Sequence, residues 1–227
     1  MNKSQDNLFS FSKLFVTLQK CTYYYDEMKL FKNFKNIRIT LCLLAFLFIS
    51  CEDDFEHNNY YLIGDSIAQC WDIRDDMPSL GEVENWGVGG YKLEDMKNIH
   101  NAQLKGKNVI VILGANDVGK INEQSIGEYT SNYIAYLKSL EAKRIYLFSI
   151  LPHAPENTVA ENQTIEKLNL SIREAVQNTL DNVIYLDAYP LFVMSDGRTN
   201  MGLFSDGIHP NKNGYERMSD LLKRNLK

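Results

Sequence analysis

The sequence predicts a three-layer α/β/α sandwich around a parallel β-sheet in residues 59–227. Short apolar runs alternate with longer amphipathic segments, and most of the short runs end near glycine, proline or aspartate. The short runs are nearly continuous in apolar residues, which is typical of strands buried on both faces, as in a parallel sheet between two helical layers. Because strand and helix patterns alternate without repeats or an internal linker, we expect one domain with right-handed crossovers.

Five segments are predicted as strands, because each is rich in branched or aromatic residues and ends near a turn-forming residue. They are Tyr60–Ile63, Val83–Trp86, Val109–Leu113, Arg144–Ile150 and Val183–Leu186, of which Val83–Trp86 has the weakest pattern. Three longer segments are predicted as helices, because their apolar residues recur at helical spacing. These are Ser125–Glu141, Glu161–Leu180 and Asn211–Leu226. A further helix is expected to begin at Ser66.

The first fifty residues do not belong to this pattern. Residues 39–49 form an uncharged apolar run that would span about 16 Å as a helix, well short of the roughly 30 Å hydrocarbon core of a membrane. Basic residues precede the run, and Ser50 and Cys51 follow it, as in a secretory signal. Because a cysteine follows directly, residues 28–50 resemble a bacterial lipoprotein signal peptide in which Cys51 is lipidated. A plain signal peptide or an N-terminal anchor helix is the alternative.

Met28 begins this signal with a leader of ordinary length, so residues 1–27 are predicted to be a spurious or disordered N-terminal extension. Residues 51–58 form an acidic tether before the domain. The tether resembles the export signal of Bacteroidetes surface lipoproteins, or it is a solvated linker. The sequence therefore predicts an exported bacterial lipoprotein, periplasmic or on the cell surface, that is anchored to the membrane by lipid on Cys51.

The composition limits the possible partners. The chain has 24 basic and 29 acidic residues, of which residues 52–227 hold 17 and 26, a net charge of −9 for that part. A chain with this acidic excess has no large positively charged surface that could bind nucleic acid. Its mean hydropathy of −0.30 excludes a multi-span membrane protein. Cys70 is the single cysteine after residue 51, so no disulfide within the domain is expected. No motif with metal-ligand spacing occurs, and neither a metal nor a cofactor is predicted.

Polar residues follow the predicted strands at the edge where open α/β sheets bind ligands. Ser66, Gly90 and Asn116 follow the first three strands, and Asp206 and His209 precede the last helix. A serine hydroxyl needs a neighbouring base, which is usually a histidine oriented by a carboxylate. The spacing lets Asp206 accept the Nδ1 proton of His209 while Nε2 faces Ser66. The Ser66 N–H, the Gly90 N–H and the Asn116 amide are candidate oxyanion donors.

Four blocks in residues 60–227 together resemble the SGNH (GDSL-type) hydrolase superfamily of serine esterases. They are Gly64-Asp65-Ser66, Gly87-Val88-Gly89-Gly90, Gly114-Ala115-Asn116-Asp117 and Asp206-Gly207-Ile208-His209. The resemblance implies a flavodoxin-like fold with a five-stranded parallel sheet and no cofactor. Matched by position, Ser66 is the nucleophile, His209 the base, Asp206 its orienting acid, and Ser66, Gly90 and Asn116 form the oxyanion hole. Ala115 departs from the glycine that many members have there.

Each block also has a simpler explanation, since glycine, aspartate and serine favour turns, and an Asp-x-x-His segment could cap a helix. Their order at successive strand ends favours catalysis. Asp65 and Asp117 are predicted to stabilise loops, and Trp71 to pack in the core. Trp86 is either a core residue or an aromatic wall of the site. His153 either contacts substrate or lies in an ordinary exposed loop.

The sequence therefore predicts a monomeric serine esterase, without a nucleic-acid partner, whose substrate is an ester. O-acetyl groups on glycans are the expected substrate. A lysophospholipase or short-chain lipid acylhydrolase is the first alternative. A glycan-binding lipoprotein without catalytic activity and an O-acyltransferase are the others.

Overall fold

The computed structural model describes residues 60–97, 101–154 and 159–226. All of them belong to the compact unit Phe55–Lys227. The predicted extension (1–27), signal peptide (28–50) and tether (51–58), with Cys51, lie outside the described residues. None of the helices in the described ranges is long and apolar enough to cross a membrane.

The described residues contain a five-stranded parallel sheet in the order β2-β1-β3-β4-β5, so the predicted fold class is confirmed. The strands are β1 (Tyr60–Gly64), β2 (Val83–Gly87), β3 (Asn108–Ile112), β4 (Arg144–Phe148) and β5 (Val183–Leu186). Gly64 pairs with Gly87 of β2 and with Ile112 of β3, so the carboxyl ends of three strands lie level. This register brings the loops after β1, β2 and β3 to one edge of the sheet.

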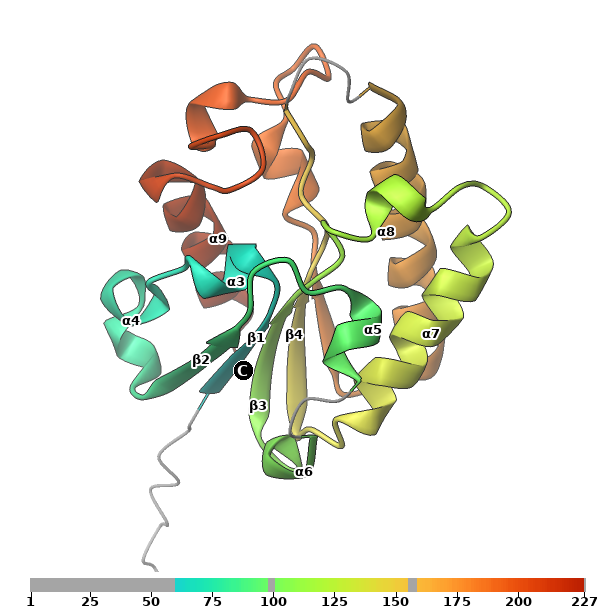
Figure 1. Ribbon diagram of the computed structural model, residues 1–227. Coiled ribbons are helices and arrows are strands. Elements are labelled where there is room, and N and C mark those ends of the chain that lie inside the picture. The colour runs from blue at the N-terminus through green and yellow to red at the C-terminus, as the bar shows by residue number, and fades with distance from the viewer. Residues whose placement is uncertain (1–59, 98–100, 155–158, 227) are drawn as a thin grey trace, which may run out of the picture. The chain divides into compact units, whose positions relative to one another are not determined.

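Helices cover both faces of the sheet (Figure 1). Helices α5 (Leu93–Met96), α6 (Asn101–Leu104), α7 (Ile126–Ser139) and α8 (Val159–Thr179) belong to one layer, and α3 (Ser66–Gln69), α4 (Ile73–Asp76) and α9 (Lys212–Asn225) to the other. Short 3₁₀ helices occupy Pro78–Leu80, Val118–Lys120, Tyr189–Phe192 and Met201–Leu203. The three long predicted helices are present, with ends that differ by only a few residues.

Alternate β1 side chains enter the two halves of the core. Tyr61 and Ile63 pack against the α7 and α8 layer, whereas Tyr60 and Leu62 pack against the α3 and α9 layer. The apolar runs are continuous because side chains on both faces of the central strands are buried. Two layers of helix therefore enclose a buried sheet whose carboxyl edge carries the polar loops.

Candidate active site

The turn between β1 and α3 presents Ser66 at the carboxyl edge of the sheet. β1 ends at Gly64, where φ is +146° and a Cβ would lie 1.7 Å from the Ile112 carbonyl oxygen, so only glycine fits. The Asp65 N–H donates to that carbonyl at 3.1 Å. The Asp65 carboxylate accepts the Ile67 N–H at 2.9 Å and caps α3. The chain thus passes from strand to helix within one residue, and Ser66 is the first residue of the helix.

Ser66, His209 and Asp206 form a continuous hydrogen-bonded row. The Ser66 Oγ lies 2.8 Å from Nε2 of His209, and the Nδ1 of His209 lies 2.7 Å from Oδ2 of Asp206. Oδ1 of Asp206 accepts the backbone N–H groups of His209 and Ile208 at 2.9 and 3.0 Å. These hydrogen bonds, led by the His209 N–H, lower the pKa of Asp206 to about 2. The carboxylate is therefore ionised at neutral pH and orients the imidazole toward the serine.

The loop that bears Asp206 and His209 is held at both ends. The Ser205 N–H donates to the His209 carbonyl at 2.8 Å, and Phe204 forms an antiparallel bridge with Pro210. From the β4 side, the Ala154 N–H donates to the Gly207 carbonyl at 2.8 Å. The catalytic histidine predicted from the sequence thus lies in a short, closed loop before α9.

The glycine-rich loop after β2 lies directly on α3. A Cβ at Gly87 would stand 2.2 Å from the Gln69 backbone nitrogen, and one at Gly89 would stand 3.9 Å from the Ser66 Cβ. Gly90 has a φ of +79° and follows at once. Among the described residues, no backbone acceptor takes up the Ser66 or Gly90 N–H. Both N–H groups therefore remain available as donors near the serine.

Asn116 lies in the turn after β3 and is joined to the glycine-rich loop. Its Nδ2 donates to the Tyr91 carbonyl at 3.0 Å, which leaves the second amide hydrogen free of that bond. The structure thus brings all five sequence-predicted residues, Ser66, Gly90, Asn116, Asp206 and His209, to the same edge of the sheet. Their catalytic roles stay predictions.

Two carboxylates lie beneath these loops. Asp65 is fully buried, and burial raises its pKa to about 6 although the N–H groups of Ile67, Ala115 and Gly114 oppose the rise. Asp117 accepts the Leu93 N–H at 3.2 Å, and its pKa is also raised, mainly by burial. Asp65 thus ties the start of α3 to the turn after β3, and Asp117 ties that turn to the first residue of α5, which agrees with the predicted stabilising role.

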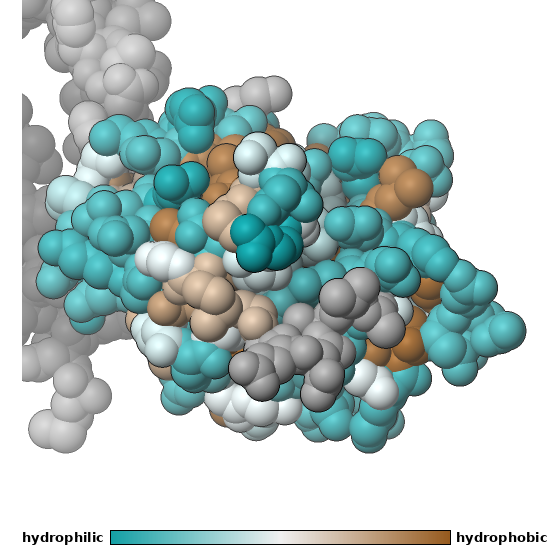
Figure 2. Space-filling view, turned by 90° about the horizontal axis from the view of Figure 1, so that it is seen from above, coloured by the Kyte–Doolittle hydropathy of each residue, from teal (hydrophilic) through white to brown (hydrophobic). Residues whose placement is uncertain are grey.

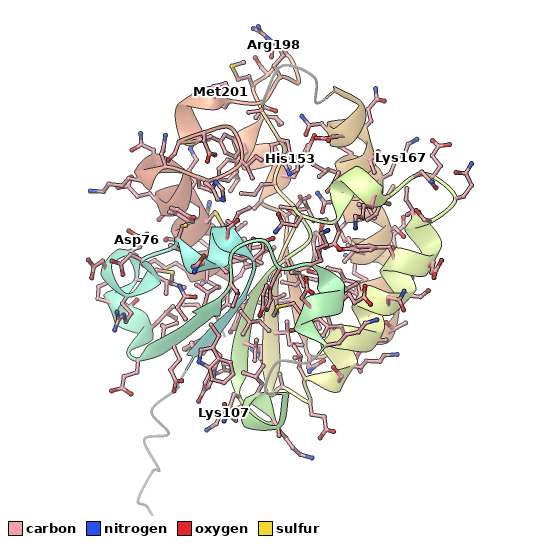
Figure 3. All side chains as sticks on the ribbon, viewed as in Figure 1. Asp76, Lys107, His153, Lys167, Arg198 and Met201 are labelled. Atoms are coloured by element: carbon pink, nitrogen blue, oxygen red, sulfur yellow. The ribbon has the colours of Figure 1, made fainter. Side chains whose placement is uncertain are left out.

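The structure confirms the prediction for one of the two tryptophans, decides between the alternatives for the other, and corrects the prediction for His153. Trp71 is only 1% exposed and stacks on Tyr215 at 5.8 Å, as predicted for a core residue. Trp86 packs edge-to-face on Tyr61 at 4.9 Å and is half-buried, which supports the core alternative. The expectation of an exposed loop at His153 is wrong, because its side chain is buried. In Figure 3, His153 lies inward of Arg198 and Met201, which stand at the outer edge.

Several amide side chains that support the site were not predicted from the sequence. Asn85 donates to the Ala68 and Trp71 carbonyls at 2.8 and 3.2 Å and so ties β2 to α3. Gln69 accepts the Gly89 N–H, and Asn162 pairs with both backbone groups of His153. For Asn85 the sequence does give a signal, because it stands two residues before the glycine-rich run. A polar residue on a helix is otherwise indistinguishable in sequence from a solvated one.

No group of three potential metal ligands comes together among the residues that the structure describes. What the assembled groups can do is acyl transfer. His209 is placed to remove the Ser66 proton, and the glycine-rich loop, which offers backbone donors, lies next to the serine side chain.

Comparisons with solved structures agree with this fold. A platelet activating factor candidate from Streptococcus pneumonia has a TM-score of 0.65 at 21% identity, with 84% of this chain and 99% of that chain covered. A GDSL-like lipase from Bacteroides thetaiotaomicron has a TM-score of 0.61 at 20% identity, covering 74% and 87%. An acetylxylan esterase from Geobacillus stearothermophilus has a TM-score of 0.56 at 20% identity, covering 75% and 95%. A search of curated proteins finds no significant match.

At the level of sequence, residues 62–217 match the model of the GDSL-like lipase/acylhydrolase family. The match includes the serine turn, the glycine-rich loop, the Asn116 turn and the Asp206–His209 loop. The chain therefore belongs to the GDSL-like lipase/acylhydrolase family and is an ester hydrolase.

Proposed function

We propose that the chain is a serine esterase that removes O-acetyl groups from glycans through an acyl-enzyme on Ser66. The observation that carries the proposal is the row of contacts from Ser66 Oγ to His209 Nε2 at 2.8 Å and from His209 Nδ1 to Asp206 at 2.7 Å.

In the proposed mechanism, His209 takes the Ser66 hydroxyl proton while Oγ attacks the ester carbonyl carbon. The carbonyl oxygen becomes an oxyanion that accepts hydrogen bonds from the Ser66 and Gly90 N–H groups and the Asn116 amide. The ester C–O bond then breaks, and His209 protonates the departing alcohol. A water molecule, deprotonated by His209, attacks the acyl-enzyme and releases the carboxylic acid with free Ser66.

The exposure of the site supports a small acyl group on a large polar alcohol. The His209 side chain is 32% exposed and that of Asp206 is 57% exposed, so a polymer can reach them without a deep entry channel. From above, this end of the molecule is covered mainly by hydrophilic residues, with separate hydrophobic patches (Figure 2). A long acyl chain would instead need an extended apolar site. The structural similarity to an acetylxylan esterase agrees with this substrate class.

The proposal is tested by hydrolysis of p-nitrophenyl esters from acetate to dodecanoate, together with acetate release from acetylated xylan. Activity should peak at acetate and fall with chain length, and the polysaccharide should release acetate. Ser131→Ala on the exposed surface of α7 is the matched control for Ser66→Ala. A peak at long chains would favour the lipid acylhydrolase, and transfer of acetate to an added sugar would favour the acyltransferase.

We also propose that the mature protein is an exported lipoprotein anchored through Cys51. The support is the basic segment, short apolar run and Ser50-Cys51 junction, followed by the acidic residues of the tether. An exported, membrane-anchored esterase would meet polysaccharides outside the cytoplasm, which agrees with the proposed substrate.

A further inference from the structure

We infer that Gln69 is a positioning residue for the oxyanion hole, because its side-chain oxygen fixes the glycine-rich loop that presents the Gly90 N–H. The inference rests on the proposed function, since it concerns how the same site stabilises a tetrahedral intermediate. Gln69 would act through the loop and not by touching substrate.

The contact joins the nucleophile helix to the oxyanion loop. Gln69 lies three residues after Ser66 on α3, and its Oε1 accepts the Gly89 N–H at 3.0 Å. The Cβ position of Gly89 stands 3.9 Å from the Ser66 Cβ, so this hydrogen bond forms right beside the serine. The serine and the loop are thereby held to the same turn of helix.

The hydrogen bond completes the restraint of one peptide unit. The carbonyl of Val88 accepts the Tyr91 N–H at 3.2 Å, and the N–H of the same peptide, that of Gly89, donates to Gln69. With both ends of this peptide held, the direction of the Gly90 N–H relative to it is set by the two backbone dihedrals of Gly89, inside the turn that the Tyr91 N–H closes.

Backbone hydrogen bonds hold the loop on either side of Gly89 and Gly90, through the Val88 and Tyr91 N–H groups, but packing at Gly90 itself is sparse. Gly90 has a φ of +79°, and no atom lies within 4 Å of its Cβ position, so no packing holds it from that side. Among the described residues, Gln69 is the one side chain that hydrogen-bonds to the backbone of Gly89 or Gly90. Without this acceptor, the Val88–Gly89 peptide could rotate and the Gly90 N–H would lose its preorganised direction.

The test compares Gln69→Met, which keeps the shape but removes the acceptor, with Gln177→Met on the exposed face of α8. We expect Gln69→Met to lower kcat for p-nitrophenyl acetate about five- to tenfold, which corresponds to one hydrogen bond of about 1 kcal/mol. KM should change less than twofold. The inhibition constant of phenylboronic acid, which forms a tetrahedral adduct with a serine hydroxyl, should rise by the same factor as kcat falls. Gln177→Met should match the wild type.

A double-mutant cycle with Gly89→Ala gives a second readout. A Cβ at Gly89 would stand 2.9 Å from the Gln69 Oε1 and would push that side chain away, so Gly89→Ala should break the same hydrogen bond. The double variant should lose no more kcat than either single variant, because both substitutions break the same hydrogen bond. Additive losses, or a kcat loss without weaker boronate binding, would overturn the inference. Undiminished hydrolysis by Ser66→Ala would instead overturn the proposed function, so the two failures are distinguishable.

Discussion

Asp206 bonds to the histidine that contacts Ser66, Asp65 directly precedes Ser66 in the chain, and their surroundings shift the two pKa values in opposite directions. Asp206 is exposed and accepts two backbone N–H groups and the His209 imidazole, so its pKa falls to about 2. Asp65 is buried, and loss of hydration raises its pKa to about 6, with the Asp117 charge adding to the rise. Asp206 therefore stays charged across the working pH range, whereas Asp65 takes up a proton in mildly acidic solution.

Asp65 should make the protein less stable as the pH rises from about 4 to about 6. An unfolded aspartate loses its proton near pH 3.8, but folded Asp65 keeps it until about pH 6. The folded state therefore binds more protons in this window, and the free energy of unfolding falls as pH rises, by up to about 2–3 kcal/mol. Urea denaturation at pH 4.5, 5.5 and 6.5 measures this slope.

Asp65→Asn is the variant that isolates the effect, because asparagine keeps an acceptor for the Ile67 N–H but does not titrate. The difference in unfolding free energy between the wild type and Asp65→Asn should change with pH across this window. If the two proteins show parallel pH dependence, Asp65 does not titrate as its burial requires.

The residues proposed to act on substrate were predictable from sequence, whereas the residues that support them were not. Serine, asparagine and an Asp-x-x-His pair at successive strand ends form a pattern, because each chemical step requires a particular residue type there. Gln69 and Asn162 support the site through the backbone of distant loops. Their contacts depend on how α3 and α8 pack, which no local spacing encodes. His153 was misjudged for the same reason, since Asn162 and Thr199 clamp its backbone inward.

At the scale of elements, α8 positions the loop after β4 with two asparagine clamps. Asn169 bonds to both the N–H and the carbonyl of Ile150, at 2.9 and 2.8 Å. Asn162, two turns earlier, does the same for His153, with both distances 2.8 Å. The next residue, Ala154, donates to the Gly207 carbonyl in the catalytic loop. The clamp at Asn162 therefore lies one hydrogen bond from the loop that holds His209.

The two clamps form a matched pair for mutation. Asn162→Ala and Asn169→Ala should each lower the free energy of unfolding by about 1–3 kcal/mol, because Asn162→Ala removes the acceptor of the His153 N–H and Asn169→Ala removes the partners of both Ile150 backbone groups. Asn162→Ala should in addition lower kcat about tenfold, since the His209 loop loses its support and small misplacements of catalytic groups are costly. Thermal melting and steady-state kinetics measure both effects. Equal kcat losses in the two variants would contradict a specific link from α8 to the catalytic loop.

The sequence predicted the strands and long helices, because burial on one or both faces leaves a clear apolar pattern. Only the opening of α3 at Ser66 was expected among the short helices, and α4, α5 and α6 were missed. Each of these has four residues, little more than one turn, so no helical period can develop. The observed strand ends differ from the predicted ends by one or two residues, mostly next to a glycine or proline, where the sequence pattern does not separate strand from turn.

At the scale of the whole molecule, the part of the chain after Cys51 is strongly acidic. Residues 52–227, which are the tether and the domain together, have a net charge of −9. Such a charge disfavours close contact with anionic lipid headgroups, so attachment to a membrane would depend on lipid at Cys51 rather than on the domain surface.

The proposed anchor predicts how the protein partitions in its native host. The wild type should enter the detergent phase of a Triton X-114 extraction, because diacylation adds two apolar chains. Cys51→Ala should move to the aqueous phase. The control is Cys70→Ala, which replaces the exposed free cysteine at the C-terminal end of α3 and should stay in the detergent phase. Retention of Cys51→Ala in the detergent phase would contradict lipid anchoring and favour an uncleaved apolar helix.

Covalent trapping tests most directly whether Ser66 is the nucleophile that His209 activates. Intact-mass spectrometry after treatment with a fluorophosphonate should show one adduct on the wild type, with peptide mapping that assigns it to Ser66. Ser66→Ala should show no adduct and should lose ester hydrolysis by about 10³-fold or more, and His209→Ala should react far more slowly. An adduct on another residue, or full hydrolysis by Ser66→Ala, would contradict the account.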